Sequence, residues 1–232
     1  LDVDTICLKL DERINKHLDT GLIHMTPREN QEESELYLME LYLAEKNLAK
    51  SILTIQQTKP VSMEIDESAL KKRVQSWLEK YSEIHHIKLS EGQLAGVFGA
   101  VFNKFFIITG GPGVGKTTVS NIIIHLFKAM GKSVLVAAST GRAAQRISES
   151  STTEARTIHR LLEWSPAEQR FLKDSFNPLV GDVILVDESS MLDIQLAEKL
   201  FDAISPLSQV ILIGDVDQLP SIGPGNVLRD FI

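Results

Sequence analysis

The sequence predicts an α/β fold in which a parallel β-sheet carries helices on both faces. From Leu89 onward, short apolar runs alternate with helical stretches; the runs read "FFIIT", "SVLVAA", "VILVD" and "QVILI". Continuous apolar runs indicate strands that are buried on both faces, as they are in parallel sheets. The first 88 residues lack such an alternation, and they favour a mainly helical region ahead of the sheet.

Within this first region, the apolar residues between Asp4 and Leu18 recur at every fourth position, which is the spacing of one helix face. Gly21 ends this helix, and "LIHM" behind it favours a strand. A second helix is predicted from Ser34 through "ELYLMELYLAEKNLAKSILTI". A third is predicted from Asp66, whose carboxylate can cap free amides. The stretch "QQTKPVSM" is the expected linker between the second and third helices.

The composition, with 43% hydrophobic and 24% charged residues, is that of an ordinary globular protein. The single cysteine, Cys7, excludes an intramolecular disulfide, and no signal-like leader opens the chain, so we expect a reducing cytoplasmic compartment. No apolar run reaches the roughly 20 residues that span a bilayer. A membrane partner is therefore not expected.

The net charge of -7 argues against a protein that coats nucleic acid with its whole surface. One segment reverses this balance. Between Lys128 and Arg160 there are six basic residues and only two acidic ones, Glu149 and Glu154. A narrow basic track on an otherwise acidic protein is therefore compatible with the composition.

The chemistry-bearing motif with the most specific pattern lies directly behind "FFIIT". Gly110 to Thr117 matches G-x-x-x-x-G-K-[ST], and it follows a predicted strand and opens a predicted helix, which is the context of a phosphate-binding loop. Glycines let backbone amides surround the phosphates, the lysine reaches the β and γ phosphates, and the hydroxyl helps to hold Mg²⁺. A chance glycine-rich turn is the alternative explanation. Nucleotide contacts are expected from Gly111, Pro112, Gly113, Val114, Gly115, Lys116, Thr117 and Thr118.

The stretch "VILVDESSM" predicts the second half of a nucleotide site, because a buried strand that ends in an acid delivers a carboxylate to the same sheet edge. Asp187 is expected to hold the metal together with Thr117. Glu188 is the better candidate for accepting a proton from the attacking water. The alternative is an acid pair that caps the following helix.

Two glutamines complete the expected nucleotide site. Gln218 lies in "QVILIGDVDQLPSIGPG", behind a third strand, where its amide can contact both the γ phosphate and a water molecule; the alternative is a solvated loop residue. Gln93 lies in "LSEGQ", and its amide can pair with adenine N6 and N7. Ser90 and Gln93 also match an S-x-x-Q capping box, and the residues alone leave both interpretations open.

The locally basic segment contains "STGRAAQRI" and "ARTIHRLL", which offer hydroxyls, arginines and helix-start amides. Such groups can hold a phosphodiester backbone without reading its bases. Solvated helix faces are the alternative explanation for a run of charges.

These motifs, in this order, resemble those of the superfamily 1 DNA helicases, and most closely the RecD-like (exodeoxyribonuclease V alpha subunit) group. The matching stretches lie between Leu89 and Leu228, and they are "LSEGQ", "TGGPGVGKTT", "STGRAAQRI", "TIHRLL", "VDESSM" and "GDVDQLPSIGPGNVL". One departure is "ASTG", where the group more often has a proline before the threonine. A looser match, "LYLAEKNLAKSI", is similar to the segment that precedes the motor domain in that group.

The resemblance implies a RecA-like P-loop NTPase domain over residues 89–232, preceded by an accessory region over residues 1–88 that belongs to a longer N-terminal domain. It implies ATP- and Mg²⁺-dependent movement along single-stranded DNA, usually 5′ to 3′. It also implies a strand-separating pin at about residues 163–179. It also implies that Gln93 contacts adenine, that Gln218 senses the γ phosphate, and that Thr140 and His159 lie near the DNA. From the motifs themselves we expect Lys116, Asp187, Glu188 and Gln218 in catalysis, and Arg142 and Arg160 at the DNA as well.

In this group a second RecA-like domain places arginines against the γ phosphate, and we expect such a domain downstream in the parent protein. Without it, the 232 residues are expected to hydrolyse ATP slowly and not to unwind DNA. Other recombination or repair subunits are further expected partners. The competing hypotheses are another P-loop phosphotransferase and a P-loop module that only binds nucleotide; a GTPase would need a guanine-reading N-K-x-D, which the sequence lacks.

Overall fold

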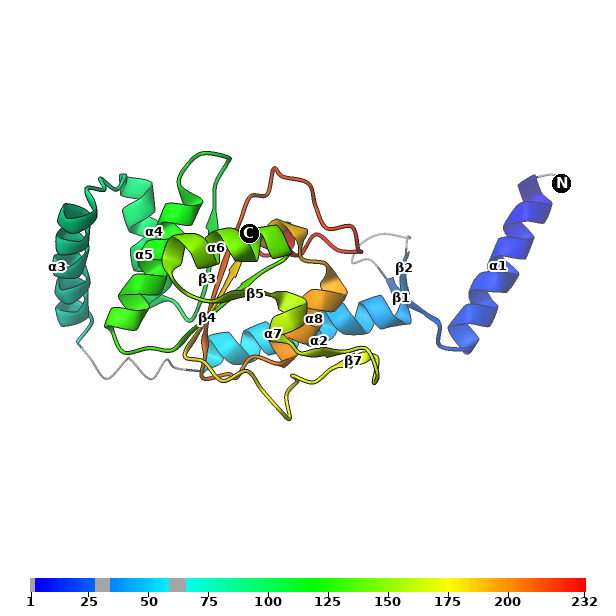
Figure 1. Cartoon of the computed structure of the whole chain (residues 1–232). Helices are drawn as coiled ribbons and strands as arrows, with labels where there is room; N and C mark the ends of the chain where they lie inside the picture. Colours follow the sequence, from blue (N-terminus) through cyan, green and yellow to red (C-terminus); the bar gives the residue numbers. More distant parts are fainter. Residues whose placement is uncertain (1–2, 28–33, 59–65) are drawn as a thin grey trace.

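The computed structural model describes residues 3–27, 34–58 and 66–232. A five-stranded, all-parallel sheet lies at its centre (Figure 1). The spatial order of its strands is β3-β9-β8-β4-β5. The predicted α/β fold with a parallel sheet is confirmed. The strands are β3 (Phe105–Thr109), β4 (Val134–Ala138), β5 (Ala155–Thr157), β8 (Val183–Asp187) and β9 (Gln209–Gly214).

Helices cover both faces of this sheet, and a hydrophobic cluster fills each side. In β8, Val183 and Leu185 belong to one cluster, whereas Ile184 and Val186 belong to the other. This explains why the strand is continuously apolar. The first face carries α3 (Glu67–His85), α4 (Glu91–Phe102), α5 (Lys116–Ala129) and α6 (Gly141–Ser151). The second carries α2 (Met39–Gln57), α7 (Ile158–Leu161), α8 (Ile194–Asp202) and α9 (Val227–Asp230).

The N-terminal part begins with α1 (Val3–Asp19), which lies apart from the five-stranded sheet (Figure 1). β1 (Ile23–Pro27) and β2 (Ser34–Leu38) then form a small antiparallel sheet. The predicted start of the second helix at Ser34 is wrong, because residues 34–38 form β2 and the helix begins at Met39. β1 supplies a pairing partner, and its hydrogen bonds override the helical propensity of "SELYL". Of the expected linker, residues 59–63 lie outside the described residues.

Two helices that precede residue 89 share their cores with the sheet. Leu48 and Ile55 of α2 are buried in the cluster on the second face, and α2 packs along α8. Leu70 and Val74 of α3 are buried in the cluster on the first face. Asp66 caps α3 as predicted, since its carboxylate accepts a hydrogen bond from the Ser68 amide at 3.1 Å. The division at residue 89 stays a prediction, but α2 and α3 are packed parts of the layered fold.

A short hairpin lies between α7 and β8 in the chain. Its strands, β6 (Trp164–Ser165) and β7 (Arg170–Phe171), pair antiparallel within the segment 163–179. The Phe171 ring contacts Trp164 at a centroid distance of 4.9 Å and His159 at 5.6 Å. Aromatic contacts therefore attach the hairpin to α7.

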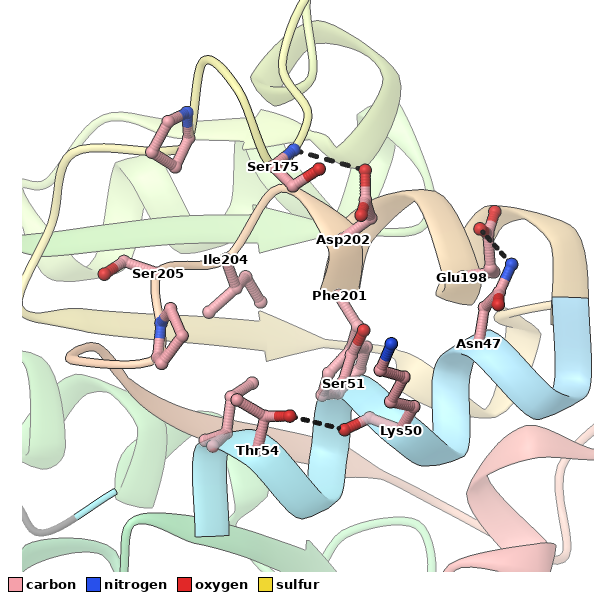
Figure 2. Close-up of a pocket in the computed structure, with 13 residues that line it drawn as sticks. Asn47, Lys50, Ser51, Thr54, Ser175, Glu198, Phe201, Asp202, Ile204 and Ser205 are labelled. Carbon is pink, nitrogen blue, oxygen red and sulfur yellow. Dashed lines mark hydrogen bonds between the residues drawn. The ribbon is translucent and has the colours of Figure 1, made fainter. Parts of the chain in front are cut away.

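A cavity of about 530 Å³ lies between α2 and α8, and Figure 2 shows the side chains around it. Its polar groups bond to one another: the Asn47 amide donates to Glu198 at 3.4 Å, and the Ser175 amide donates to Asp202 at 3.2 Å. None of the sequence-predicted site residues lines it. Among the described helices, none is both long and apolar enough to cross a membrane.

Candidate functional site

The predicted site residues meet at the carboxyl edge of the parallel sheet. The loop behind β3 is the phosphate-binding loop, the loop behind β9 carries Gln218, and Glu188 follows β8. Behind the next two strands, β4 and β5, come α6 and α7. The expected nucleotide residues therefore lie at the ends of three adjacent strands, and the basic segment lies at the ends of the two strands beside them.

The phosphate-binding loop has the backbone that its glycines permit. Gly113 and Gly115 have φ angles of 77° and 86°, in the left-handed region that favours glycine. A Cβ atom at Gly115 would also lie 2.4 Å from the Gln93 Nε2 atom. α5 begins at Lys116, so its first amides face the loop, as an anion site requires.

Lys116 is held by hydrogen bonds to the loop that precedes it. Its ammonium group donates to the carbonyl oxygens of Gly110 and Gly111, the latter at 2.8 Å. It also pairs with the Asp215 carboxylate at 3.4 Å. The lysine therefore sits where it can exchange these partners for phosphate oxygens.

Asp215 is a further candidate site residue, which the sequence alone did not single out. Its side chain is 1% exposed, and it accepts hydrogen bonds from the Asp217 amide at 3.1 Å and the Gln218 side chain at 3.2 Å. Burial raises the pKa of Asp215, but these two hydrogen bonds and the Lys116 ammonium lower this pKa more, so that it lies below its usual value. Asp215 thus joins Lys116 to Gln218. The available signal was an acid directly behind a buried strand, the same pattern that singled out Asp187.

Gln93 uses both ends of its amide. Its Oε1 accepts a hydrogen bond from the Ser90 backbone amide at 3.0 Å. The Ser90 hydroxyl accepts one from the Gln93 backbone amide at 3.3 Å, which completes the capping box. Its Nε2 donates to the Val114 carbonyl at 3.0 Å. Gln93 therefore caps α4 and touches the phosphate-binding loop, and its role as an adenine reader stays a prediction.

Asp187 ends β8 and is 8% exposed. Burial raises its pKa above the usual value, although the Glu188 amide, which donates to its Oδ1 at 2.8 Å, acts in the opposite direction. An ionised carboxylate in such a place is stabilised by a cation. Thr117 is exposed at the start of α5 and offers a hydroxyl oxygen.

These oxygen donors fit Mg²⁺. In nucleotide sites this ion is commonly bound by one or two protein oxygens together with phosphate oxygens, not by an all-protein cage. In the described part of the chain, no group of three or more His, Cys, Asp or Glu side chains could hold a metal. Asp187 and Thr117 would hold the ion beside the phosphates.

Glu188 has an unusual backbone, with φ at 52° in the left-handed region, where non-glycine residues are uncommon. Its carboxylate is 24% exposed and pairs with the Arg146 guanidinium at 3.3 Å. It does not cap a regular helix, since the residues behind it, Ser189–Met191, form a single 3₁₀ turn without a side-chain cap. Its carboxylate is therefore free of the capping role that was the alternative explanation.

The basic segment places four predicted residues at the neighbouring edge. Thr140 is the N-cap of α6, where its hydroxyl accepts from the Ala143 amide at 3.2 Å. Arg142, His159 and Arg160 are exposed. Neither arginine has an ion-pair partner among the described residues. An open groove of about 580 Å³ between α6, β5 and α7 includes Gly141 and Arg160.

The chain is similar to known proteins over most of its length. Residues 93–224 match the family model described as "AAA domain". The ATP-dependent RecD2 DNA helicase of Deinococcus radiodurans is 36% identical over 194 residues, which cover 83% of this chain and 25% of the relative. The RecBCD enzyme subunit RecD of Mycolicibacterium smegmatis is 31% identical over 221 residues, which cover 85% of this chain and 37% of the relative.

The chain thus spans between a quarter and two fifths of the length of these relatives. A solved structure of Pif1 helicase from Candida albicans aligns with a TM-score of 0.44 and 25% identity, over 59% of this chain and 34% of that one. The family match covers the phosphate-binding loop, Asp187 at the end of β8, Glu188 behind it, and Gln218. The chain belongs to the AAA domain family, and over most of its own length it is similar to RecD proteins.

Proposed function

We propose that the protein is part of an ATP-dependent DNA helicase that couples ATP binding and hydrolysis to movement along single-stranded DNA. One observation carries the proposal. The residues expected to bind the nucleotide follow β3, β9 and β8, and the exposed basic residues of α6 and α7 follow the neighbouring strands β4 and β5. The similarity to a relative named as an ATP-dependent DNA helicase supports the same activity.

For the nucleotide, the amides of the phosphate-binding loop and α5 bind the phosphates, and Lys116 turns from Asp215 to the β and γ oxygens. Thr117 and Asp187 would hold Mg²⁺, and this ion would neutralise charge that develops on the phosphates. Glu188 accepts a proton from the attacking water. Gln218, anchored through Asp215, orients that water and responds to the γ phosphate.

For the DNA, Thr140, Arg142, His159 and Arg160 contact the phosphodiester backbone and read no bases. The hairpin within residues 163–179 has a shape suited to a strand-separating pin, and the contact of Phe171 with His159 would attach it to the DNA surface. A second RecA-like domain, recombination subunits and a cytoplasmic location complete the proposal; the greater length of the relatives supports further domains. Another P-loop phosphotransferase would not respond to single-stranded DNA.

The DNA assignment is tested by replacing Arg142 or Arg160 with alanine. Each change is expected to weaken binding to a labelled oligo(dT) a few-fold, because one phosphate contact and its counterion release are lost. The slope of log affinity against log salt is expected to fall by about 0.7 for each contact. Fluorescence anisotropy measures both quantities. Arg73→Ala on α3, an exposed arginine on another helix, is the matched control and should leave both unchanged.

Unaltered affinity and slope in Arg142→Ala and Arg160→Ala, with a measurable wild-type affinity, would place the DNA elsewhere. A wild-type ATPase that ignores single-stranded DNA would instead favour the phosphotransferase alternative.

The two interpretations of Gln93 make different predictions. If Gln93 reads adenine, Gln93→Ala is expected to weaken ATP binding by about tenfold and GTP binding much less, because one bidentate pair contributes about 1–3 kcal/mol of discrimination. If it only caps α4, the variant should melt at a lower temperature with unchanged selectivity, since a lost cap costs about 1 kcal/mol. Titration calorimetry with both nucleotides and a thermal melt separate these outcomes. Ser90→Ala, which removes the cap and keeps the amide, is the matched control.

A further inference from the structure

The ion pair between Arg146 and Glu188 joins the two halves of the site. Arg146 lies on α6 four residues behind Arg142, so both guanidinium groups project from the same side of the helix. The Arg146 side chain is 63% exposed, and yet its Nη2 donates to the Glu188 Oε1 at 3.3 Å. A side chain of α6, the helix proposed to bind DNA, therefore bonds to Glu188, the proposed proton acceptor.

A second contact from the same segment holds the Glu188 backbone. The Ser139 hydroxyl, between β4 and α6, donates to the Glu188 carbonyl at 2.9 Å. Residues 139–146 thus hold Glu188 through both its main chain and its carboxylate. The left-handed φ of Glu188 is a conformation that needs such support.

We propose that Arg146 is a positioning residue. It holds Glu188 while no DNA is bound, and it releases Glu188 when a DNA phosphate binds at α6. This inference rests on the proposed function. A guanidinium so exposed can turn to an incoming phosphate, and the phosphate and the Glu188 carboxylate, being like charges, compete for it. In the pair, the carboxylate points at the arginine; once released, it can face the attacking water.

The size of the effect is bounded by the exposure of the pair. An exposed ion pair is worth at most about 1 kcal/mol, which corresponds to roughly fivefold in an equilibrium constant. Because coupling between two ligands of one group is reciprocal, weakening the Glu188 pair must strengthen DNA binding by the same factor. The inference can therefore be tested by binding alone, without nucleotide.

The experiment is a double-mutant cycle on oligo(dT) affinity at low salt, with the wild type, Glu188→Gln, Arg146→Gln and the double variant. Glu188→Gln is expected to raise the affinity by about two- to fivefold when Arg146 is present. In the Arg146→Gln background the same change should have little effect. Glu149→Gln, which removes a carboxylate from the same helix without touching Arg146, measures the general effect of charge and should give equal ratios in both backgrounds.

Equal ratios for Glu188→Gln in both backgrounds, in a protein that binds oligo(dT), would overturn the inference and leave the proposed function intact. A wild type with no affinity for oligo(dT) would reject the proposed function and the inference together. If Arg146→Gln does not fold, Arg146→Lys takes its place, because it keeps the charge and loses the planar guanidinium.

A second measurement is ATP hydrolysis. Arg146→Gln should raise the rate of hydrolysis without DNA and reduce the stimulation of this rate by DNA. A lower rate without DNA would contradict the release step.

Discussion

Replacing Lys116 by alanine is expected to weaken ATP binding by about 10² to 10⁴. The lysine would make charge-assisted hydrogen bonds to two phosphates, each worth about 1.5–3 kcal/mol, and 1.4 kcal/mol corresponds to tenfold in affinity. The variant also removes the cation that faces the buried Asp215 carboxylate, so that a negative charge near the incoming phosphates is left unpaired. Both effects act in the same direction. Titration calorimetry with ATP and Mg²⁺ measures the loss.

Lys128→Ala is the matched control for this experiment. Lys128 lies near the end of the same helix and donates to the Thr153 hydroxyl at 2.6 Å, away from the phosphate-binding loop. Its loss should leave ATP affinity unchanged. A thermal melt of both variants shows whether they are folded. An affinity for ATP in a folded Lys116→Ala protein equal to that of the wild type would remove the phosphates from this loop.

Local features of the site could be predicted because their causes are local. Gly115 and Lys116 are recognisable in sequence since the loop needs a left-handed residue directly before a helix start. The capping box of Ser90 and Gln93 is a matter of three-residue spacing. Continuous apolar strands such as β8 are visible because both of their faces are buried.

The contacts that join these motifs could not be predicted, because they depend on which strands are neighbours in space. Asp215 is 99 residues from Lys116 along the chain, and the two meet because β9 pairs with β3. Arg146 meets Glu188 because β4 pairs with β8. The error at Ser34 has the same origin, since only the pairing with β1 decides between strand and helix there.

Replacing Glu188 by glutamine is expected to reduce ATP hydrolysis by about 10² to 10⁴ while ATP still binds, because general base catalysis typically contributes that factor. Glutamine has nearly the shape of glutamate, but it loses the ion pair with Arg146, and its amide cannot take a proton from water. Three observations support this role: the carboxylate is partly exposed, it forms no side-chain cap on the 3₁₀ turn behind it, and it directly follows β8, which ends at Asp187. The measurement is steady-state ATP hydrolysis with saturating oligo(dT), together with ATP affinity by calorimetry. Glu149→Gln is the control for loss of charge.

Because a positioned base contributes a factor of at least about 10² to the rate, a rate that stays within about threefold of the wild type would mean that another group accepts the proton. Asp187 would then be tested next, with the difference that its replacement should also weaken the binding of Mg²⁺ and ATP.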